Sequence, residues 1–504
     1  MVQINVSKIN ESIVFVECSN TIAQELYNYF SAHTENYRFS PAYKQGRWDG
    51  RLRIFNITNH QLPIGLSYKL KEFSDQGKYS ISFNYQIGEL VSKEEFISFV
   101  ESLNLPFPPY DYQLKSAYDA LRNKHLNIQS VTGSGKSLSI YLVIRWLETK
   151  NIKTLLIVPK VQLVEQMFGD FLDYGWEDVE DKCCRIYGGQ KRLLNKNVII
   201  STYQSLYADA KKGQIGQDYI DFSSIEALII DECHSSKNTS INTISKKTFN
   251  SSYRIGYSAT YPEENSADWF TIVGTTGRIK QYTTYQKLQD DNQIANLKIK
   301  VIKLNYPQSV RKLNYETNKG NYADEVNYIN LQSSRMDFIV KLISKIEGNT
   351  LVFFIKKENQ GIPLYNKIKN ELPNKKVFYI DGSVSVSDRE SIRSQMEASG
   401  DVILVGSFGC ISEGTNIKRI HNIVFAASYK SEIKVLQSIG RSLRLWNDKE
   451  HATLYDLVDN LKYIDKDHGI WYSNSTLEHG KKRFDIYKEQ KFEVETIEYN
   501  INER

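Results

Sequence analysis

Cysteine pairs and long apolar runs are both missing from this chain of 504 residues. Its five cysteines, Cys18, Cys183, Cys184, Cys233 and Cys410, form no CxxC pair, so we expect reduced, buried thiols rather than a zinc site or a disulfide framework. The longest apolar runs, such as 155–158 and 227–230, are strand-sized and far short of the roughly 20 residues that cross a bilayer. The first residues carry neither a basic nor an extended apolar stretch, so no signal peptide is expected. We therefore expect a cytoplasmic protein that makes no membrane contact.

A strong net charge is missing as well. The chain has 64 basic and 59 acidic residues, and the resulting charge of +5 is too small to identify a nucleic-acid binder. A content of 41% hydrophobic and 24% charged residues is typical of a globular protein and excludes a disordered chain. Aromatic residues, in contrast, are plentiful: 33 Tyr and 22 Phe stand beside only 10 Pro. Tyrosine can stack on bases or fill a core, so the composition permits nucleic-acid binding without requiring it.

Two successive series of strand-sized apolar runs dominate the middle of the chain, the first within 126–257 and the second within 350–457. Helix-like segments separate the runs, which is typical of parallel sheets covered on both faces. We therefore predict an α/β fold with two tandem doubly wound domains behind a small N-terminal α+β domain. The predicted domains cover 1–104, 105–290 and 291–460, and a helical extension is predicted over 461–504.

A phosphate-binding loop is predicted over 130–137, with the sequence SVTGSGKS. The segment follows a strand-like run and opens a helix-like stretch, which is the context that such a loop requires. Its glycines let backbone N–H groups turn toward phosphate oxygens, the lysine would hold the β- and γ-phosphates of ATP, and the last serine would offer its hydroxyl to Mg²⁺. The predicted ATP contacts here are Thr132, Gly133, Ser134, Gly135, Lys136 and Ser137. Ser130 replaces the first glycine of the usual GxxxxGK[ST] pattern.

Two adjacent acids, Asp231 and Glu232, end the apolar run 227–230. Asp231 is placed to hold Mg²⁺, largely through water, and Glu232 is placed to orient and deprotonate an attacking water. In isolation, a solvated acidic turn after a strand would explain the pair equally well. The phosphate-binding loop that precedes it favours the catalytic interpretation.

These residues resemble the motifs of the superfamily 2 helicases and translocases, in which two RecA-like domains bind ATP between them. The sequence Asp231-Glu232-Cys233-His234 departs from the commoner DEAD or DEAH at Cys233, a small side chain that should be tolerated. Within the superfamily, the resemblance to phage recombination helicases extends through nearly the whole chain. It includes Tyr37-Arg38-Phe39, the stretch 46–51 and His479-Gly480.

The resemblance implies further site residues. Gln113, which follows Tyr112, resembles the adenine-reading element. The segment Ser258-Ala259-Thr260 resembles the motif that couples hydrolysis to strand movement, and His234 is expected to contact it. In the second domain the implied ATP contacts are Gly414 and Asn416, and the implied catalytic residues are Gln437, Arg441 and Arg444. A guanidinium at the γ-phosphate stabilises the charge of the transferring oxygens and is worth about 10³–10⁵ in rate in related systems.

Nucleic-acid contacts are implied at strand ends and in a basic N-terminal patch. The implied strand-end contacts are Pro159, Lys160, Ser201, Thr202, Lys356 and Ser407. The patch consists of Arg38, Lys44, Arg47, Arg51 and Arg53 with Trp48 among them, set against the single acid Asp49. Arginines supply salt-sensitive phosphate contacts and aromatics stack on bases, although core aromatics with a solvated basic rim would give the same pattern. The later run 481–483 (Lys-Lys-Arg) fits a solvated helix better than another phosphate contact.

The resemblance implies a helicase or translocase that depends on ATP and Mg²⁺ and acts on branched DNA, with 3′-to-5′ polarity. Forks, Holliday junctions and R-loops are the implied substrates, in phage recombination, repair and replication. An RNA–DNA hybrid is a second candidate partner, and we expect a monomer in the host cytoplasm. Three alternatives stay open: a restriction-type duplex translocase that does not separate strands, an RNA helicase, and a nonenzymatic nucleic-acid scaffold.

Overall fold

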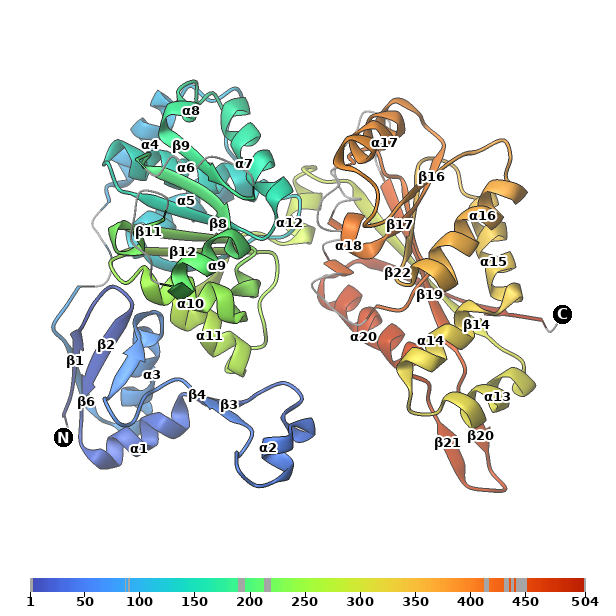
Figure 1. Cartoon of the computed structure of the whole chain (residues 1–504), viewed down its shortest axis with the longest axis horizontal. Helices are drawn as coiled ribbons and strands as arrows, with labels where there is room; N and C mark the ends of the chain where they lie inside the picture. The colour runs from blue at the N-terminus through green and yellow to red at the C-terminus, as the bar shows by residue number, and fades with distance from the viewer. Residues whose placement is uncertain are drawn as a thin grey trace. The chain divides into compact units, whose positions relative to one another are not determined.

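The computed structural model describes residues 3–86, 88, 91–188, 195–212, 219–411, 417–429, 435–436, 439–440 and 451–502. The chain divides into two compact units, residues 1–283 and 284–504 (Figure 1). None of the described helices is long and apolar enough to cross a membrane.

The first unit contains a parallel sheet of seven strands in the order β13-β7-β12-β11-β8-β10-β9. The strands are β7 (His125–Gln129), β8 (Thr154–Val158), β9 (Cys183–Ile186), β10 (Val198–Thr202), β11 (Ala227–Asp231), β12 (Tyr253–Ser258) and β13 (Arg278–Gln281). The helices between and beside them are α5 (Asp111–Asn123), α6 (Lys136–Thr149), α7 (Val161–Asp173), α8 (Val179–Lys182), α9 (Tyr203–Lys212), α10 (Thr239–Lys247) and α11 (Ala267–Thr276). Short η3 (Phe222–Ser224) and η4 (Cys233–Lys237) complete the domain.

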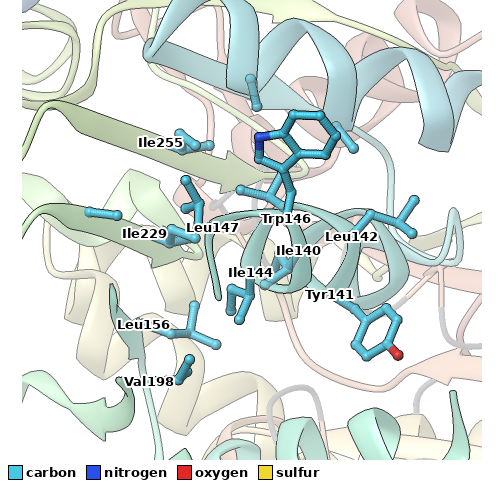
Figure 2. Packing of buried hydrophobic residues seen from close by; sticks show 14 of the residues in the cluster. Ile140, Tyr141, Leu142, Ile144, Trp146, Leu147, Leu156, Val198, Ile229 and Ile255 are labelled. Carbon is cyan, nitrogen blue, oxygen red and sulfur yellow. The ribbon is translucent and has the colours of Figure 1, made fainter. Parts of the chain in front are cut away.

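Helix α6 lies at the centre of this domain because it is apolar on most of its surface. Its residues 138–144 are all buried, which is typical of a helix enclosed by other elements. Ile144 and Leu147 of α6 share one core with Leu156, Ile229 and other strand residues (Figure 2). This packing fixes the start of α6 at the carboxyl end of β7.

The N-terminal domain is a small mixed sheet with two helices and a projecting arm. Its strands β1 (Gln3–Lys8), β2 (Ile13–Glu17), β5 (Gln61–Pro63) and β6 (Ser80–Phe83) lie in the order β5-β2-β1-β6, with α1 (Asn20–Tyr29), η2 (Ile64–Leu66) and α3 (Ser67–Gly77). The arm is built from β3 (Ser31–His33), η1 (Tyr37–Phe39), α2 (Pro41–Lys44) and β4 (Arg51–Arg53), and it projects from the domain (Figure 1).

Helix α4 (Lys93–Ser102) lies within the span 1–104 that we predicted for the N-terminal domain, but its side chains join the next core. The Phe96 ring lies 5.9 Å from that of Trp146 in α6 and 5.7 Å from that of Tyr118 in α5. The Pro-rich stretch that follows α4 suggested the boundary, whereas the apolar face of α4 determines where the helix packs.

The N-terminal domain is fixed to the domain with the first seven-stranded sheet by buried polar and apolar contacts. Trp269, Phe270 and Val273 of α11 belong to the core of the N-terminal domain. Lys69 Nζ lies 2.7 Å from Glu264 Oε1. Arg254, 1% exposed in β12, donates to the carbonyl of Glu11 at 3.0 Å. Buried charged groups that keep their partners resist separation, so the two domains form one body.

The second unit contains another seven-stranded parallel sheet, in the order β16-β17-β15-β18-β19-β14-β22. Its strands are β14 (Asn296–Asn305), β15 (Thr350–Phe354), β16 (Lys376–Ile380), β17 (Val402–Ser407), β18 (Asn422–Phe425), β19 (His451–Asn460) and β22 (Glu493–Asn500). Its helices are α12 (Tyr285–Asp290), α13 (Gln308–Asn318), α14 (Tyr322–Asn330), α15 (Ser333–Ser344), α16 (Ile362–Glu371), α17 (Val386–Ala398), α18 (Phe408–Ile411) and α20 (Ser475–Glu489), with η5 (Lys357–Gly361) before α16. The two parallel sheets and the small N-terminal domain confirm the predicted fold class.

The predicted helical extension over 461–504 needs a correction. Besides α20, the segment contains the hairpin β20 (Tyr463–Asp465) and β21 (Ile470–Tyr472), and β22 pairs with β14. Strand β22 lies at the edge of the sheet and its acids face lysines of β14, as in the 3.0 Å contact between Glu498 and Lys303. This exposed charge masked the strand pattern. Arg483 is also not solvated: it is fully buried, 2.8 Å from Asp456.

A substitution at Gly65 can test how closely the N-terminal domain approaches α11. A Cβ at this position would lie 2.1 Å from the carbonyl oxygen of Val273 and 2.9 Å from that of Gly274. We expect Gly65→Ala to lower the free energy of unfolding by about 1–3 kcal/mol, because backbone cannot yield to the added methyl. Chemical denaturation measures this. Gly169→Ala in α7, where nothing lies within 4 Å, is the control, and equal stability of both variants would contradict the close approach.

Candidate nucleotide site and nucleic-acid contacts

The phosphate-binding loop connects β7 to α6, as the sequence predicted. Gly133 has φ +92° and Gly135 has φ +71°, both in the left-handed region that glycine adopts without steric cost. The loop therefore turns its backbone N–H groups inward at the N-terminus of α6, where the helix dipole favours an anion. Ser134 Oγ is buried and has no hydrogen-bond partner among the described residues. An orphaned donor in this loop fits a phosphate group.

The side chain of Gln113 is hydrogen-bonded to the phosphate-binding loop. Its Oε1 accepts from the N–H of Tyr110 at 2.9 Å, and its Nε2 donates to the carbonyls of Ser134 at 2.9 Å and Gly135 at 3.2 Å. The Tyr112 hydroxyl donates to the same Ser134 carbonyl at 2.9 Å. Both ends of the Gln113 amide are thus bonded to main-chain groups, and its adenine contact stays a prediction.

Lys136 and the paired acids meet at the carboxyl edge of the sheet. Lys136 Nζ lies 3.4 Å from Glu232 Oε1, and His234 Nδ1 lies 3.3 Å from Glu232 Oε2. Burial raises the pKa of the Glu232 carboxyl, but Lys136 and His234 outweigh burial and hold it below its usual range. Burial and the charge of Glu232 raise the pKa of Asp231. Glu232 also has φ +51°, a left-handed conformation that stores strain directly after β11.

Asp231 and Ser137 fit the predicted Mg²⁺ site. Asp231 Oδ1 is buried and receives no hydrogen bond from any described residue, so a cation would satisfy it and favour its ionised form. Ser137 Oγ lies 2.7 Å from the hydroxyl of Tyr174, whose pKa burial raises to about 12. Ser137 can donate a hydrogen bond to the Tyr174 oxygen and keep its own oxygen lone pairs for the cation. Tyr174 carries no sequence signal that would have identified it.

The expected contact between His234 and the segment Ser258-Ala259-Thr260 is present, while the coupling role of this segment stays a prediction. His234 Nδ1 lies 2.9 Å from Ser258 Oγ, and Ser258 Oγ donates to the carbonyl of Thr260 at 2.8 Å. Ala259 and Thr260 are buried, and Thr260 Oγ1 has no hydrogen-bond partner among the described residues. A change at Glu232 can therefore reach this segment through one histidine.

Cys233 fits its position because Gly256 of the neighbouring strand has no side chain. Cys233 is fully buried, and a Cβ on Gly256 would lie 2.6 Å from its Sγ. Burial raises the pKa of the Cys233 thiol to about 11, so it is a packed, protonated side chain.

The predicted strand-end DNA contacts differ in how accessible they are. Pro159 and Lys160 are half-buried after β8, Ser407 is half-buried at the end of β17, and Lys356 is exposed after β15. Ser201 and Thr202, at the end of β10, are buried. The Ser201 hydroxyl donates to the carbonyl of Ile186 at 2.8 Å, and Thr202 Oγ1 lies 2.9 Å from Ser205 Oγ. Their side chains are committed inside the domain, which leaves only main-chain groups there for a contact with DNA.

The basic patch lies on the projecting arm. Arg38, Lys44, Arg47 and Arg51 are exposed. Arg53 is bonded to Asp49 and lies 4.8 Å above the Tyr27 ring, so it braces the arm and is not a free cation. Trp48 Nε1 donates to the carbonyl of Arg51 at 3.0 Å, which ties the indole to the backbone.

The aromatic residues of the stretch 37–55 divide between core and surface. Phe55 is 1% exposed and Phe39 is 75% exposed. Tyr37 stacks on His33 at 4.2 Å. The ambiguity of the sequence pattern is therefore real, because the same stretch supplies core residues and an exposed ring.

Five predicted site residues lie outside the described part of the chain: Gly414, Asn416, Gln437, Arg441 and Arg444. Their roles stay predictions from the resemblance.

Comparison with known families shows the class of protein to which the chain belongs. Three family models match successive parts of the chain: "DNA helicase UvsW, N-terminal" at residues 3–84, "Type III restriction enzyme, res subunit" at 106–263 and "Helicase conserved C-terminal domain" at 334–445. Together with the two parallel sheets, these matches define a superfamily 2 helicase with tandem RecA-like domains.

The relatives identify the particular family. The chain is 32% identical over 501 residues to the ATP-dependent DNA helicase UvsW of enterobacteria phage T4, an alignment that covers 95% of this chain and 96% of the relative. The crystal structure of T4 UvsW matches with a TM-score of 0.51 and 29% identity, covering 99% of this chain and all of that one. The chain belongs to the UvsW family of ATP-dependent DNA helicases.

A restriction enzyme shares the fold. The DNA-bound Type ISP restriction-modification enzyme LlaBIII matches with a TM-score of 0.58 and 14% identity, over 79% of this chain and 32% of that one. At this identity the likeness shows the fold alone.

The hydrogen bonds from Gln113 to the loop carbonyls predict that a substitution at this residue lowers the affinity for ATP. Gln113→Glu keeps the acceptor for Tyr110 but cannot donate to the two loop carbonyls, so we expect ATP binding to weaken about tenfold, as the loss of two hydrogen bonds implies. Titration with a fluorescent ATP analogue measures this. Gln162→Glu at the start of α7 is the control. Unchanged affinity in Gln113→Glu would contradict the bracing role.

Proposed function

We propose that this helicase moves along DNA at the expense of ATP and unwinds or branch-migrates branched DNA, such as forks, Holliday junctions and R-loops. The full-length match to UvsW, including the N-terminal domain at residues 3–84, supports this most strongly. From the family resemblance we further propose 3′-to-5′ polarity, a role in phage recombination, repair and replication, and action as a monomer in the host cytoplasm. An RNA–DNA hybrid is a second candidate substrate.

The residues of the first unit divide the chemistry of ATP hydrolysis. Lys136 and the loop N–H groups hold the phosphates in place. Mg²⁺, when bound, neutralises developing charge on the phosphate oxygens, and Asp231 and Ser137 are the residues that would hold it. Glu232 orients the attacking water and accepts its proton. His234 then passes the change at Glu232 to Ser258, which lies 2.9 Å away.

The pairing of Lys136 with Glu232 supports this division. At 3.4 Å the Lys136 ammonium favours the ionised form of the Glu232 carboxyl. When a phosphate of ATP pairs with the Lys136 ammonium, Glu232 loses its main counter-ion. The pKa of its carboxyl then rises, and Glu232 becomes a stronger base. The base is thereby activated where the substrate is bound.

Exchange of the proposed base separates binding from hydrolysis. We expect Glu232→Gln to bind ATP and DNA like the wild type but to hydrolyse ATP about 10²–10⁴-fold more slowly, since the amide cannot accept the proton. Single-turnover hydrolysis and DNA binding measure the two effects. Glu263→Gln, an exposed acid on the segment after Thr260, should retain full turnover. Wild-type turnover in Glu232→Gln would remove this residue from the mechanism.

The exposed arginines of the arm predict a salt-dependent effect on DNA binding. Neutralising Arg47 and Arg51 to Gln should weaken the binding of forked DNA and reduce the slope of log affinity against log salt by about 1–2, because each phosphate contact contributes about 0.7–0.9. Fluorescence anisotropy over a salt series measures the slope. Lys246→Gln with Lys247→Gln on α10 removes the same charge from another exposed surface and should leave the slope unchanged. An unaltered slope in the arginine variant would make the patch structural.

A strand-displacement assay tests the proposed function itself. It compares forks, four-way junctions, R-loops and blunt duplexes with and without ATP. ATP-dependent separation of the branched substrates supports the proposal. Displacement of a bound third strand without separation of the duplex would favour a restriction-type translocase. Preference for an all-RNA duplex would favour an RNA helicase, and the absence of ATP turnover would favour a scaffold.

A further inference from the structure

A short hairpin after β19 is not explained by the ATP site. Strands β20 and β21 pair antiparallel, with Ile464 opposite Trp471, and the turn between them contains Gly469 at φ +64°. The hairpin projects beyond the body of the second unit (Figure 1). A two-stranded hairpin is at best marginally stable alone, so its base must be held by the domain.

One face of the hairpin packs against helices α13 and α14. The Tyr463 ring stacks on Tyr315 of α13 at 5.2 Å, with 28° between the ring planes. The Tyr472 hydroxyl donates to Glu325 Oε2 of α14 at 3.2 Å. The N–H of Leu461, just before the hairpin, donates to Asn474 Oδ1, just after it, at 2.9 Å. These contacts make the hairpin a rigid element.

The opposite face carries an exposed aromatic ring beside a cation. Trp471 is 69% exposed, and among the large apolar side chains of the described residues Phe39 and Leu331 alone are more exposed. Lys462 Nζ lies 5.9 Å from the centre of its ring. Successive residues of a strand alternate between faces, so Trp471 points away from the tyrosines that root the hairpin. A rigid, exposed ring next to an ammonium can stack on a base and contact the adjoining phosphate.

The carboxylate of Asp465 in the hairpin is already paired, so it repels a phosphate less than an unpaired carboxylate would. The Asp465 carboxylate accepts from the backbone N–H groups of Asp467 and His468 and lies 3.0 Å from the His468 ring nitrogen. Asp465 is thus engaged within the turn. Lys466, at the turn, is exposed.

The position of the hairpin in the sheet points to a nucleic-acid strand. Because all strands of the second sheet are parallel, the carboxyl ends of β15, β17 and β19 lie at one edge. Lys356 follows β15 and Ser407 ends β17, and both are proposed DNA contacts, while the hairpin follows β19. Each strand spacing is about 4.8 Å, and β19 runs on to Asn460, roughly 10 Å past the level of Phe354. The end of β19 therefore lies roughly 14 Å from the end of β15 and roughly 18 Å from that of β17. A strand held at Lys356 is therefore within a few nucleotides of the hairpin.

We propose that Trp471 stacks on an exposed base of single-stranded DNA and that the β20–β21 hairpin is a contact element for the strand on the second unit. The proposal rests on the proposed function, because it takes the bound strand from there. Stacking needs no particular base, since every base has an aromatic face. The contact would hold a separated strand without reading its sequence.

Photo-crosslinking tests the contact directly in the full-length protein. A single-stranded oligonucleotide with 5-iododeoxyuridine at successive positions is irradiated in the complex, and the adduct is located by mass spectrometry. We expect an adduct at Trp471 in the wild type. We also expect Trp471→Ala to bind the oligonucleotide about five- to tenfold more weakly, at the lower end of the effect of losing one stacked base, and Trp471→Phe to lose less.

Leu331→Ala, which removes another exposed apolar side chain of the same unit (70% exposed), is the matched control. ATP turnover without DNA should be the same in all variants, which shows that they fold. Wild-type affinity in Trp471→Ala, or adducts that never include the hairpin, would overturn the proposal and point to a protein partner for this face. If the wild type displaces no strand, the proposed function fails; if both wild type and Trp471→Ala displace strands equally, the hairpin proposal fails alone.

Discussion

The contact between Lys136 and Glu232 depends on the order of three strands, and the rest of the site depends on that contact. Strands β7, β12 and β11 are neighbours in the first sheet. Their carboxyl ends carry the phosphate-binding loop, the segment beginning at Ser258 and the paired acids. A partly buried ammonium and carboxylate stabilise one another only at close range, since either alone would be costly to desolvate. The fold therefore holds the phosphate-binding loop, Glu232 and the segment that begins at Ser258 close together.

The same unit joins this site to the N-terminal domain. Helix α11 follows the coupling segment and supplies Trp269 and Phe270 to the N-terminal core, while Arg254, at the start of β12, bonds to the backbone of Glu11. The arm with its arginines is thus fixed, through the N-terminal domain, to the domain that holds the phosphate-binding loop. On the second unit, the hairpin with Trp471 follows β19, whose carboxyl end lies on the same side of the sheet as that of β15, which precedes Lys356. Each unit presents its aromatic and basic side chains on a short two-stranded element, rooted in a larger packed core.

The parts of the fold and site that local sequence determines could be predicted. Gly133 and Gly135 are required by backbone geometry, and apolar runs of strand length separated by helices define parallel sheets. Features that depend on which elements pack over a residue in the folded chain could not be predicted. Ser201 and Arg483 have polar side chains that suggested solvent, but neighbouring elements bury and bond them. Strand β22 was hidden because its edge position allows charged residues. Tyr174 belongs to the site only because the fold brings it to Ser137.

We propose that Lys136 links nucleotide binding to the action on DNA. ATP turnover and strand displacement of a forked DNA by Lys136→Ala, measured together with binding of the same fork, test it most directly. We predict that turnover and strand displacement are both lost while fork binding through the exposed arginines of the arm persists. Wild-type turnover in this variant would contradict the account of the phosphate-binding loop.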